Sequence, residues 1–373
     1  MSLSLFLYLY SSITLVVLNY IYFRLKVFYR KITYKDKETG KIIDLGEKYD
    51  PFRPYDPIHY FQFISFGFFL FPIRAITSFL ICIGLCLNLK YLKYKYNNLD
   101  KDPHQNEIHS EVIKFWSFLF LFTNGISLEK EKIEYEEIYK KYLGPEYNFK
   151  EEKYSLIISN HIGYYDVMAN MAINGCGFMA MKIISYIPIG GDIAKDMGSI
   201  FVERLSQSSR KESFDEIIER QKNFYEGKIL TKIVVFPEGT TSNNRYIVKF
   251  KKGVFRSLLP LKPIIMHIDK NAPFHLCSNV TNLFFHVMRS FTCLNNKLYY
   301  CELPIIKPTD FMFEHYKNLG KEKWEIYANV VKNMYAEMGN FKMSELGHRD
   351  KDIYYEALES NIYNGELLSK NLI

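Results

Sequence analysis

The sequence lacks the cysteine patterns of disulfide-rich and zinc-binding proteins. Its six cysteines are scattered along 373 residues, without a Cys-x-x-Cys pair and without cysteines and histidines at the spacing of zinc ligands. Cys82 and Cys86 lie in an apolar run and are predicted to be small buried hydrophobic residues. A secreted domain stapled by disulfides and a zinc finger are therefore poorly supported.

The sequence also lacks internal repeats and any extreme of charge. Charged residues make up 24% and hydrophobic residues 48% of the chain, which is enough for one large folded core. The 48 Lys and Arg residues outnumber the 41 Asp and Glu residues, giving a net charge of +7. A mildly basic surface suits acidic partners such as anionic lipid, phosphate groups or nucleic acid, and does not choose among them.

The N-terminus lacks the basic start and the small-residue cleavage site of a signal peptide. Residues 3–23 are instead almost wholly apolar and uncharged, and about 20 such residues span a bilayer as a helix. A basic cluster follows within residues 24–31. The pattern predicts a transmembrane anchor in residues 1–34, with its C-terminal end in the cytosol.

A second apolar run covers residues 61–89 and has Pro72 and Arg74 near its middle. Each half is too short to cross a hydrocarbon core of about 30 Å as a helix. A continuous span would place Arg74 near the bilayer centre, at a cost of about 2.5–3.5 kcal/mol. A membrane-embedded helical hairpin over residues 58–92, dipping into one leaflet, avoids both problems and is favoured over a continuous span.

From residue 154 onward, apolar runs typical of β-strands alternate with helical stretches. This alternation predicts an α/β fold, a mixed sheet flanked by helices, over residues 151–345. Residues 110–150 are predicted to be an amphipathic connector, and residues 346–373 a C-terminal tail. The predicted strands are 154–159, 177–181, 199–202, 232–236, 263–268 and 298–306, and the predicted helices are 166–173, 210–225 and 323–338.

The first candidate site follows the predicted strand at 154–159. His161 lies where α/β sheets place ligands, just past the carboxyl end of a strand, and Asp166 begins the next helix. Helical side chains lean toward the helix N-terminus, so Asp166 can hold one ring nitrogen of His161 and leave the other free as a general base. On spacing alone, a helix cap with a solvated aspartate explains the pattern equally well.

Two further motifs follow other predicted strands. The strand at 199–202 leads to Arg204, a side chain that can hold phosphate through two parallel hydrogen bonds, although a surface salt bridge explains it more simply. The strand at 232–236 runs into a Pro-Glu-Gly loop followed by three hydroxyl residues. This sequence predicts a tight loop of polar donors at the same edge of the sheet, with a plain hairpin turn as the alternative.

Together these motifs resemble those of the glycerolipid acyltransferase family. The His-x4-Asp pair of that family is matched by His161 and Asp166. Its other blocks, G-x-x-F-x-x-R, F-P-E-G-T and a proline-bounded apolar strand, are matched by residues 198–204, 236–240 and 260–265. The sequence most resembles the lysophosphatidylcholine and lysophosphatidylethanolamine acyltransferases. It departs from that branch at Asn244, where a glycine is usual, and at Lys262, where an apolar residue is usual.

The resemblance implies an O-acyltransferase that moves an acyl group from acyl-CoA to the free hydroxyl of a lysophospholipid. His161 would be the general base and Asp166 its orienting partner. Acyl-CoA is implied as a co-substrate, with no other cofactor and no metal, and the implied partners are the lipid bilayer and the two substrates, not nucleic acid. The implied substrate-binding residues are Asn160, Gly198, Phe201, Arg204, Phe236, Pro237, Glu238, Gly239, Thr240, Thr241, Pro260 and Pro263.

The acceptor stays open at this level. A lysophosphatidic acid or glycerol-3-phosphate acyltransferase is the alternative within the family, and a non-catalytic lipid-binding membrane protein is the alternative outside it. The resemblance also implies a membrane location, the endoplasmic reticulum, with the catalytic domain facing the cytosol. The sequence lacks the calcium-binding loops that some members of the family carry after the catalytic domain.

Overall fold

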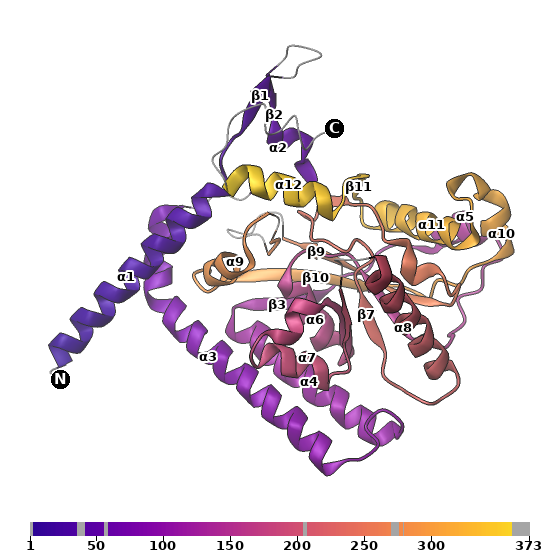
Figure 1. Cartoon of the computed structure of the whole chain (residues 1–373), viewed down its shortest axis with the longest axis horizontal. Helices are drawn as coiled ribbons and strands as arrows, with labels where there is room; N and C mark the ends of the chain where they lie inside the picture. Colours follow the sequence, from indigo (N-terminus) through magenta and orange to yellow (C-terminus); the bar gives the residue numbers. More distant parts are fainter. Residues whose placement is uncertain are drawn as a thin grey trace.

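The computed structural model describes residues 3–35, 42–55, 59–203, 207–269, 276–278 and 280–359. The chain begins with helix α1 (Leu3–Val27), followed by the antiparallel pair β1 (Thr33–Lys35) and β2 (Ile42–Asp44) and the short helix α2 (Leu45–Lys48). Two long helices come next, α3 (Tyr60–Lys95) and α4 (Pro103–Thr123), which pack on one another (Figure 1).

The rest of the chain forms the predicted α/β fold around one mixed sheet. Its seven strands lie in the order β3-β10-β9-β4-β7-β5-β6. The five strands from β9 to β6 in this order run parallel, whereas β10 is antiparallel to β9 and parallel to β3. The strands are β3 (Ile126–Lys130), β4 (Leu156–Ser159), β5 (Gly177–Met181), β6 (Ile200–Val202), β7 (Ile233–Val235), β9 (Leu261–Ile268) and β10 (Asn296–Glu302), with β8 (Tyr246–Ile247) and β11 (Lys342–Met343) paired separately.

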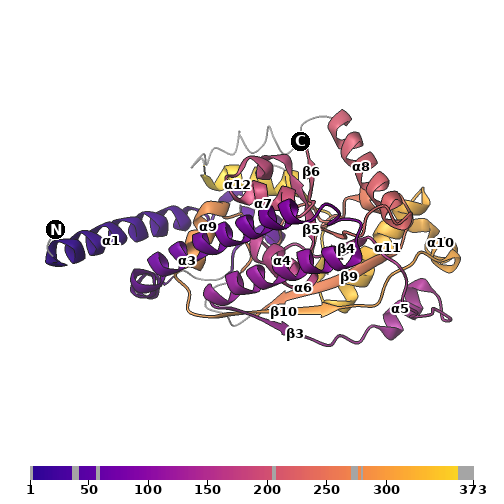
Figure 2. The same cartoon turned by 90° about the horizontal axis from the view of Figure 1, so that it is seen from below.

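Helices cover both faces of the sheet (Figure 2). Because strand side chains alternate between faces, Leu156 and Ile158 of β4 join one buried cluster and Ile157 joins the other. The first cluster lies under α5 and α11, and the second under α4 and α6. The helices are α5 (Glu136–Leu143), α6 (Tyr164–Asn174), α7 (Gly190–Asp196), α8 (Gln207–Tyr225), α9 (Leu283–Ser290), α10 (Asp310–His315), α11 (Lys323–Met338) and α12 (His348–Glu359).

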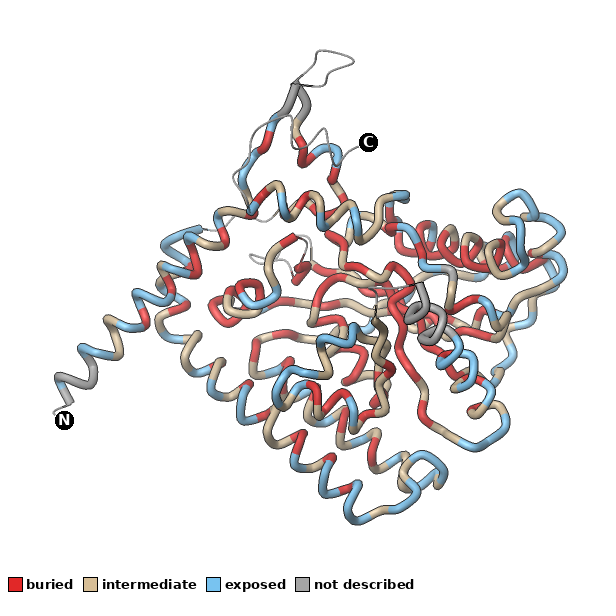
Figure 3. Tube along the Cα trace, viewed as in Figure 1, coloured by how far each residue is buried: buried red, intermediate tan, exposed pale blue. Residues whose placement is uncertain are grey.

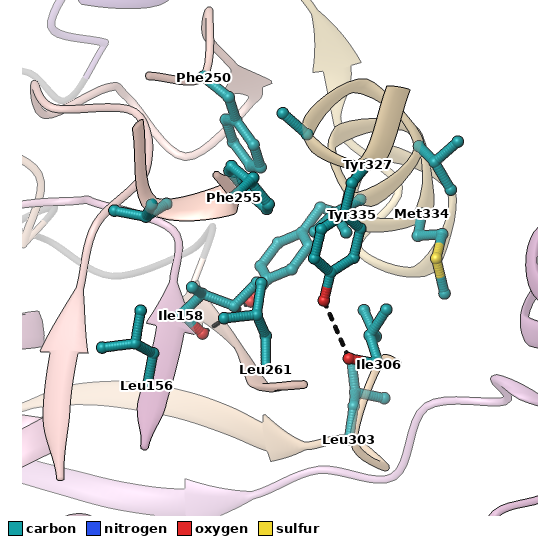
Figure 4. Close-up of a cluster of buried hydrophobic side chains, with 14 of the residues drawn as sticks. Leu156, Ile158, Phe250, Phe255, Leu261, Leu303, Ile306, Tyr327, Met334 and Tyr335 are labelled. Carbon is teal, nitrogen blue, oxygen red and sulfur yellow. Dashed lines mark hydrogen bonds between the residues drawn. The ribbon is translucent and has the colours of Figure 1, made fainter. Parts of the chain in front are cut away.

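Two tyrosines of α11 bring polar groups into the first cluster (Figure 4). The Tyr335 hydroxyl donates to the Ile158 carbonyl at 2.7 Å, and the Tyr327 hydroxyl donates to the Ile306 carbonyl at 3.0 Å. A buried hydroxyl without such a partner would be costly. The two bonds therefore fix α11 against the sheet as well as satisfying both tyrosines.

The predicted membrane hairpin at residues 58–92 is wrong, because α3 is one helix from Tyr60 to Lys95. Pro72 lies inside this helix without ending it. A proline has no N–H group, so the carbonyl four residues earlier loses its usual hydrogen-bond donor. Here the hydroxyl of Tyr10, in α1, donates to that carbonyl, on Phe68, at 3.1 Å. A contact with α1 thus replaces the missing helical bond.

Arg74 also fails to interrupt α3. Its side chain is buried inside the protein, where the guanidinium donates to the main-chain carbonyls of Cys293 and Leu294, the second at 2.9 Å. These carbonyls lie in the loop after α9. Because the charge is satisfied by the protein's own backbone, Arg74 does not oppose a continuous helix at this position.

Among the described residues, α3 is the helix long and apolar enough to cross a membrane, with a mean hydropathy of 2.1 over its most apolar window. The predicted N-terminal helix is confirmed as α1, but its role as an anchor stays a prediction. Figure 3 shows exposed residues recurring along α3 and α4. Large apolar side chains exposed on these two helices include Phe61, Phe69, Ile73, Ile76, Leu80, Leu87, Phe115, Phe118 and Phe122.

Residues from both ends of the chain form a small unit that we call the cap. It consists of residues 28–35 and 42–55 together with α12, which runs from the end of α1 toward β11 in Figure 1. Tyr49 and Tyr354 stack in its core with ring centroids 5.4 Å apart. The cap core also includes Phe28, Ile32, Leu45, Phe52, Leu358, Val280 and Val248, the last of which follows β8.

Candidate active site

The sheet brings the two main sequence motifs together. His161 follows β4 and Glu238 follows β7, and these two strands are parallel neighbours. Parallel neighbours end at the same edge of a sheet, so the loops that follow them meet. The contact is direct, because the His161 N–H donates to Oε1 of Glu238 at 2.7 Å.

The ring of His161 is held by Asp166, as the sequence predicts. The Nδ1 atom of His161 lies 2.9 Å from Oδ2 of Asp166. The α6 helix starts at Tyr164, so His161 is in the preceding loop and Asp166 is in the first helical turn, where the helix dipole favours a carboxylate. The same Oδ2 accepts the N–H groups of Ile162 and Gly163, the second at 3.1 Å. Asp166 is therefore fixed by three donors.

The other ring nitrogen of His161 remains available for chemistry. A carboxylate only accepts hydrogen bonds, so Asp166 keeps the proton on Nδ1 and leaves the lone pair on Nε2. The side chain of His161 is 21% exposed, while that of Asp166 is fully buried. The ring of Phe236 stacks on the His161 ring at 4.2 Å between centroids. The pair is thus ordered on one side and accessible on the other.

Glu238 is buried and faces the backbone. Its Oε1 accepts from His161, and its Oε2 accepts the N–H of Val248 at 3.1 Å. Burial raises the pKa of Glu238 to about 8. The carboxyl group therefore ties the His161 loop to the chain just after β8, and its predicted contact with substrate stays a prediction.

The loop after Glu238 turns tightly and returns to the histidine. Gly239 has φ of +62°, a conformation that favours glycine. The Ser242 N–H donates to the His161 carbonyl at 2.9 Å, which joins this loop to the His161 loop a second time. Thr240 is buried, whereas Thr241 is partly exposed at the site.

Two asparagines tie this edge of the sheet to β9. Asn160 exchanges two hydrogen bonds with the backbone of Met266, at 2.9 and 2.8 Å. Asn244 donates to the same carbonyl and accepts the N–H of Ile268, each at 3.0 Å. Asn244 has φ of +61°, a conformation that asparagine tolerates better than most residues other than glycine. This explains how asparagine fits where the resembling branch has glycine.

The second and fourth predicted blocks lie elsewhere in the sheet. Gly198 precedes β6, and Phe201 is part of it, with β7 and β5 separating that edge strand from β4. Arg204 lies outside the described residues. Pro260 precedes β9, and Pro263 lies within it, opposite Ile158 of β4.

The sequence reasoning missed two residues that the fold brings to this edge. Lys351 of α12 and Ser278, which precedes α9, both contact Thr241. Their own sequence surroundings carry no motif, and only the tertiary fold brings them to the loop. Within the described ranges, no group of three His, Cys, Asp or Glu side chains is arranged to hold a metal ion.

Comparison with known proteins finds a family model and several relatives similar to this chain. Residues 141–268 match the family model described as Acyltransferase. The lysophospholipid acyltransferase LPEAT1 of Arabidopsis thaliana is 29% identical over 212 residues, covering 57% of this chain and 51% of that protein. The lysophospholipid acyltransferase LPCAT4 of Xenopus tropicalis is 24% identical over 249 residues, covering 63% and 44%.

Among solved structures, the 1-acyl-sn-glycerophosphate acyltransferase PlsC from Thermotoga maritima is similar, with a TM-score of 0.45 and 16% identity. The similarity covers 71% of this chain and 97% of that one. The chain spans about half the length of LPEAT1 and 44% of LPCAT4. The matched residues 141–268 contain the His161–Asp166 pair, so this part of the chain is similar to the acyltransferase family.

Proposed function

We propose that this protein transfers an acyl group from acyl-CoA to the free hydroxyl of a lysophospholipid at a membrane. The observation that carries the proposal is the His161–Asp166 pair at the carboxyl end of β4, with Nε2 free. The family match and the names of the lysophospholipid acyltransferases LPEAT1 and LPCAT4 support the substrate class.

In this proposal His161 is the general base. Its Nε2 takes the proton from the acceptor hydroxyl as the oxygen attacks the thioester carbonyl. The tetrahedral intermediate then expels the CoA thiolate, which receives that proton from the imidazolium of His161. A positioned base contributes about 10²- to 10⁴-fold in rate. Asp166 stabilises the imidazolium that forms between the two steps, as the carboxylate does in a Ser-His-Asp triad. Backbone and hydroxyl donors near Gly239 and Thr240 would stabilise the oxyanion.

The roles of the remaining motif residues are also proposals. Both oxygens of Glu238 accept backbone N–H groups, which supports a positioning role for this residue. Arg204 is proposed to hold a phosphate of the acceptor, because its planar guanidinium can bind two phosphate oxygens at once.

A small apolar cavity supports a substrate that has an apolar part. It has a volume of about 110 Å³ and lies between α3, α4, α6 and α7. Leu85, Trp116 and Met168 are among its lining residues. Because α6 also carries Asp166 in its first turn, the cavity and the partner of His161 lie on one helix. We propose that a short part of the acyl chain occupies this cavity.

Membrane contact is proposed to involve α3. The helix is long and apolar enough to cross a bilayer and exposes side chains such as Phe69 and Ile76. Water is a poor environment for so many exposed apolar groups. A membrane location would deliver amphiphilic substrates to the site, and we propose the endoplasmic reticulum with the catalytic domain on the cytosolic side.

The test is an acceptor panel with the purified full chain in phospholipid vesicles. Labelled acyl-CoA is offered with lysophosphatidylcholine, lysophosphatidylethanolamine, lysophosphatidic acid or glycerol 3-phosphate, and a heat-denatured sample gives the background. We expect diacyl product from one or both of the first two acceptors. Preference for the last two would overturn the proposed acceptor, and no transfer to any acceptor would overturn the proposed enzyme.

A further inference from the structure

Lys351 reaches the candidate active site from the cap, outside the matched residues 141–268. It lies in the first turn of α12. Its ammonium group donates to the carbonyl oxygen of Thr241 at 3.3 Å and also to the Thr241 hydroxyl. Thr241 belongs to the loop after β7 that carries Glu238. The C-terminal helix therefore places a cationic group directly on the catalytic loop.

Thr241 and its neighbours are tied to the backbone around His161. The Ser278 hydroxyl donates to Oγ1 of Thr241 at 3.0 Å, and the Ser278 N–H donates to the Ile162 carbonyl at 3.0 Å. Ser242, the residue after Thr241, donates its N–H to the His161 carbonyl. The hydroxyls of Thr241 and Ser278, and the ammonium that contacts Thr241, are thus fixed next to the backbone of the His161 loop.

This cluster presents donors to its surroundings. An ammonium group has three N–H donors, and the contacts with Thr241 use two of those on Lys351. Oγ1 of Thr241 already accepts from Lys351 and Ser278, so its own O–H is left for another acceptor. Within the part of the chain that the structure describes, no carboxylate lies in ion-pair range of Lys351. Lys351 and Thr241 each keep part of their surface exposed, while the amine of Lys351 itself is buried against Thr241.

The local electrostatics favour an anion at this place. Burial of its amine lowers the pKa of Lys351 to about 8, and a bound anion would favour the charged form. Glu238 does not compete as an anion near neutral pH, because burial raises its pKa to about 8. A tetrahedral oxyanion would accept hydrogen bonds from an ammonium and from hydroxyls together.

We propose that Lys351, Thr241 and Ser278 form a phosphate-binding site beside His161. The inference rests on the proposed function, in which both substrates carry phosphate, the lysophospholipid in its headgroup and acyl-CoA in its nucleotide part. The site deepens that function by making the cap a part of substrate binding. Lys351 then holds a phosphate while the hydroxyl to be acylated, or the thioester, meets His161.

The test compares Lys351→Met, Lys351→Arg and the control Lys249→Met, which removes an exposed lysine just after β8. Each full-length variant is assayed with lysophosphatidylcholine and acyl-CoA, varying one substrate at a time. We expect Lys351→Met to lower kcat/KM for one substrate about ten- to hundredfold, mostly through KM, because one charge-assisted contact is lost. Lys351→Arg should recover most of the loss, and the control should match the wild type.

The pattern of KM identifies the source of the phosphate. A raised KM for lysophosphatidylcholine alone assigns the site to the acceptor, and a raised KM for acyl-CoA alone assigns it to the donor. A fall in kcat with both KM values unchanged would mean that Lys351 only positions Thr241, and it would overturn the phosphate site, as would wild-type kinetics in Lys351→Met. If the wild type itself transfers no acyl group, the proposed function fails instead. If Lys351→Met does not fold, the Lys351→Arg variant decides. A Lys351→Arg protein that keeps its melting temperature and both KM values but loses activity also overturns the site.

Discussion

The carboxyl edge of the sheet and the flank made by α3 and α4 treat polarity in opposite ways. At the sheet edge, Asp166 and Glu238 are 1% and 0% exposed, and hydrogen bonds are made to Oδ2 of Asp166 and to both carboxyl oxygens of Glu238. On the flank, Ile73 and Leu87 are each 61% exposed. Burying a carboxyl group lowers stability unless hydrogen bonds compensate for the lost water, and exposing aliphatic side chains to water is unfavourable unless another apolar surface covers them.

The difference indicates two kinds of constraint on one chain. At the sheet edge, the cost of burying acids is offset by bonds that hold His161 in one orientation, as its proposed role as a general base requires. On the flank, nothing in the described residues covers the apolar side chains, which is consistent with a lipid surface as their neighbour. The predictions below separate the two regions, because changes at the edge should alter catalysis and changes on the flank should alter membrane binding.

The largest effect is expected from Asp166→Asn at the sheet edge. An amide oxygen can still accept a hydrogen bond, but it cannot stabilise the imidazolium through charge, so kcat should fall by about 10²- to 10⁴-fold. Steady-state assays measure the effect. Asp192→Asn serves as the control, because it removes only a surface ion pair with Lys90. Equal activity in the two variants would separate Asp166 from catalysis.

Glu238→Gln should lower stability and change its pH dependence. The amide nitrogen cannot accept a backbone N–H, so one of the two bonds is lost at a cost of about 1–3 kcal/mol. The pKa of Glu238 is about 8 in the folded protein, above its ordinary value of 4.5. The folded state therefore keeps a proton that the unfolded chain releases, and this contribution is complete below pH 4.5 and is lost as the pH rises through 8.

Melting temperatures of the wild type and Glu238→Gln, measured in detergent at pH 5, 7 and 9, check this prediction. The gap between the two proteins should narrow as the pH rises, because the variant lacks the titrating group. The exposed Glu314→Gln provides the control and should show no pH-dependent gap. A gap that widens with pH would contradict the raised pKa of Glu238.

On the flank, Ile76→Ser should weaken vesicle binding without lowering the melting temperature. Ile76 is 61% exposed, so the substitution removes little packing inside the protein. Burying such a side chain in lipid contributes about 1.5 kcal/mol or more, which corresponds to at least roughly a tenfold change in partitioning. Leu89→Ser, on the buried side of the same helix, should instead lower the melting temperature. Unchanged flotation of Ile76→Ser with vesicles would remove lipid as the neighbour of this surface.

The smallest effect is expected from Tyr10→Phe, which removes the hydroxyl that caps the Phe68 carbonyl. The loss should be about 1 kcal/mol, measured by thermal or denaturant unfolding in detergent. In a Pro72→Ala background the helix regains its own N–H donor, so Tyr10→Phe should then cost less. Equal costs in both backgrounds would contradict the account of how α3 accommodates Pro72.

The sequence was sufficient to predict the parts of the site that depend on local structure. His161 lies in the loop after β4, and Asp166 lies in the first turn of the helix that follows. Because the two residues are close in the sequence, this local structure is enough to bring them together. The strands β4, β5, β6, β7, β9 and β10 were recognisable as apolar runs, whereas the two-residue β8 was not predicted. The edge strand β3 was missed, because its sequence, Ile-Ser-Leu-Glu-Lys, is half polar and resembles the connector in which it lies.

The errors and omissions involve contacts between distant segments. Pro72 and Arg74 predict a broken helix when α3 is considered alone, and only the hydroxyl of Tyr10 and the carbonyls after α9 make it continuous. Lys351 is 110 residues from Thr241, and no local pattern links them. The buried position of Glu238 likewise depends on Val248 and the cap core, which form only when the chain folds.

The most direct test of the central claim is acyl transfer by His161→Ala. The purified full-length variant is assayed with labelled acyl-CoA and lysophosphatidylcholine, alongside the wild type and His104→Ala, which removes an exposed histidine in the first turn of α4. We predict that His161→Ala loses at least about a hundredfold in kcat while keeping its melting temperature and vesicle binding, and that His104→Ala retains full activity. A folded His161→Ala protein with more than about a tenth of wild-type activity would contradict the assignment of His161 as the general base.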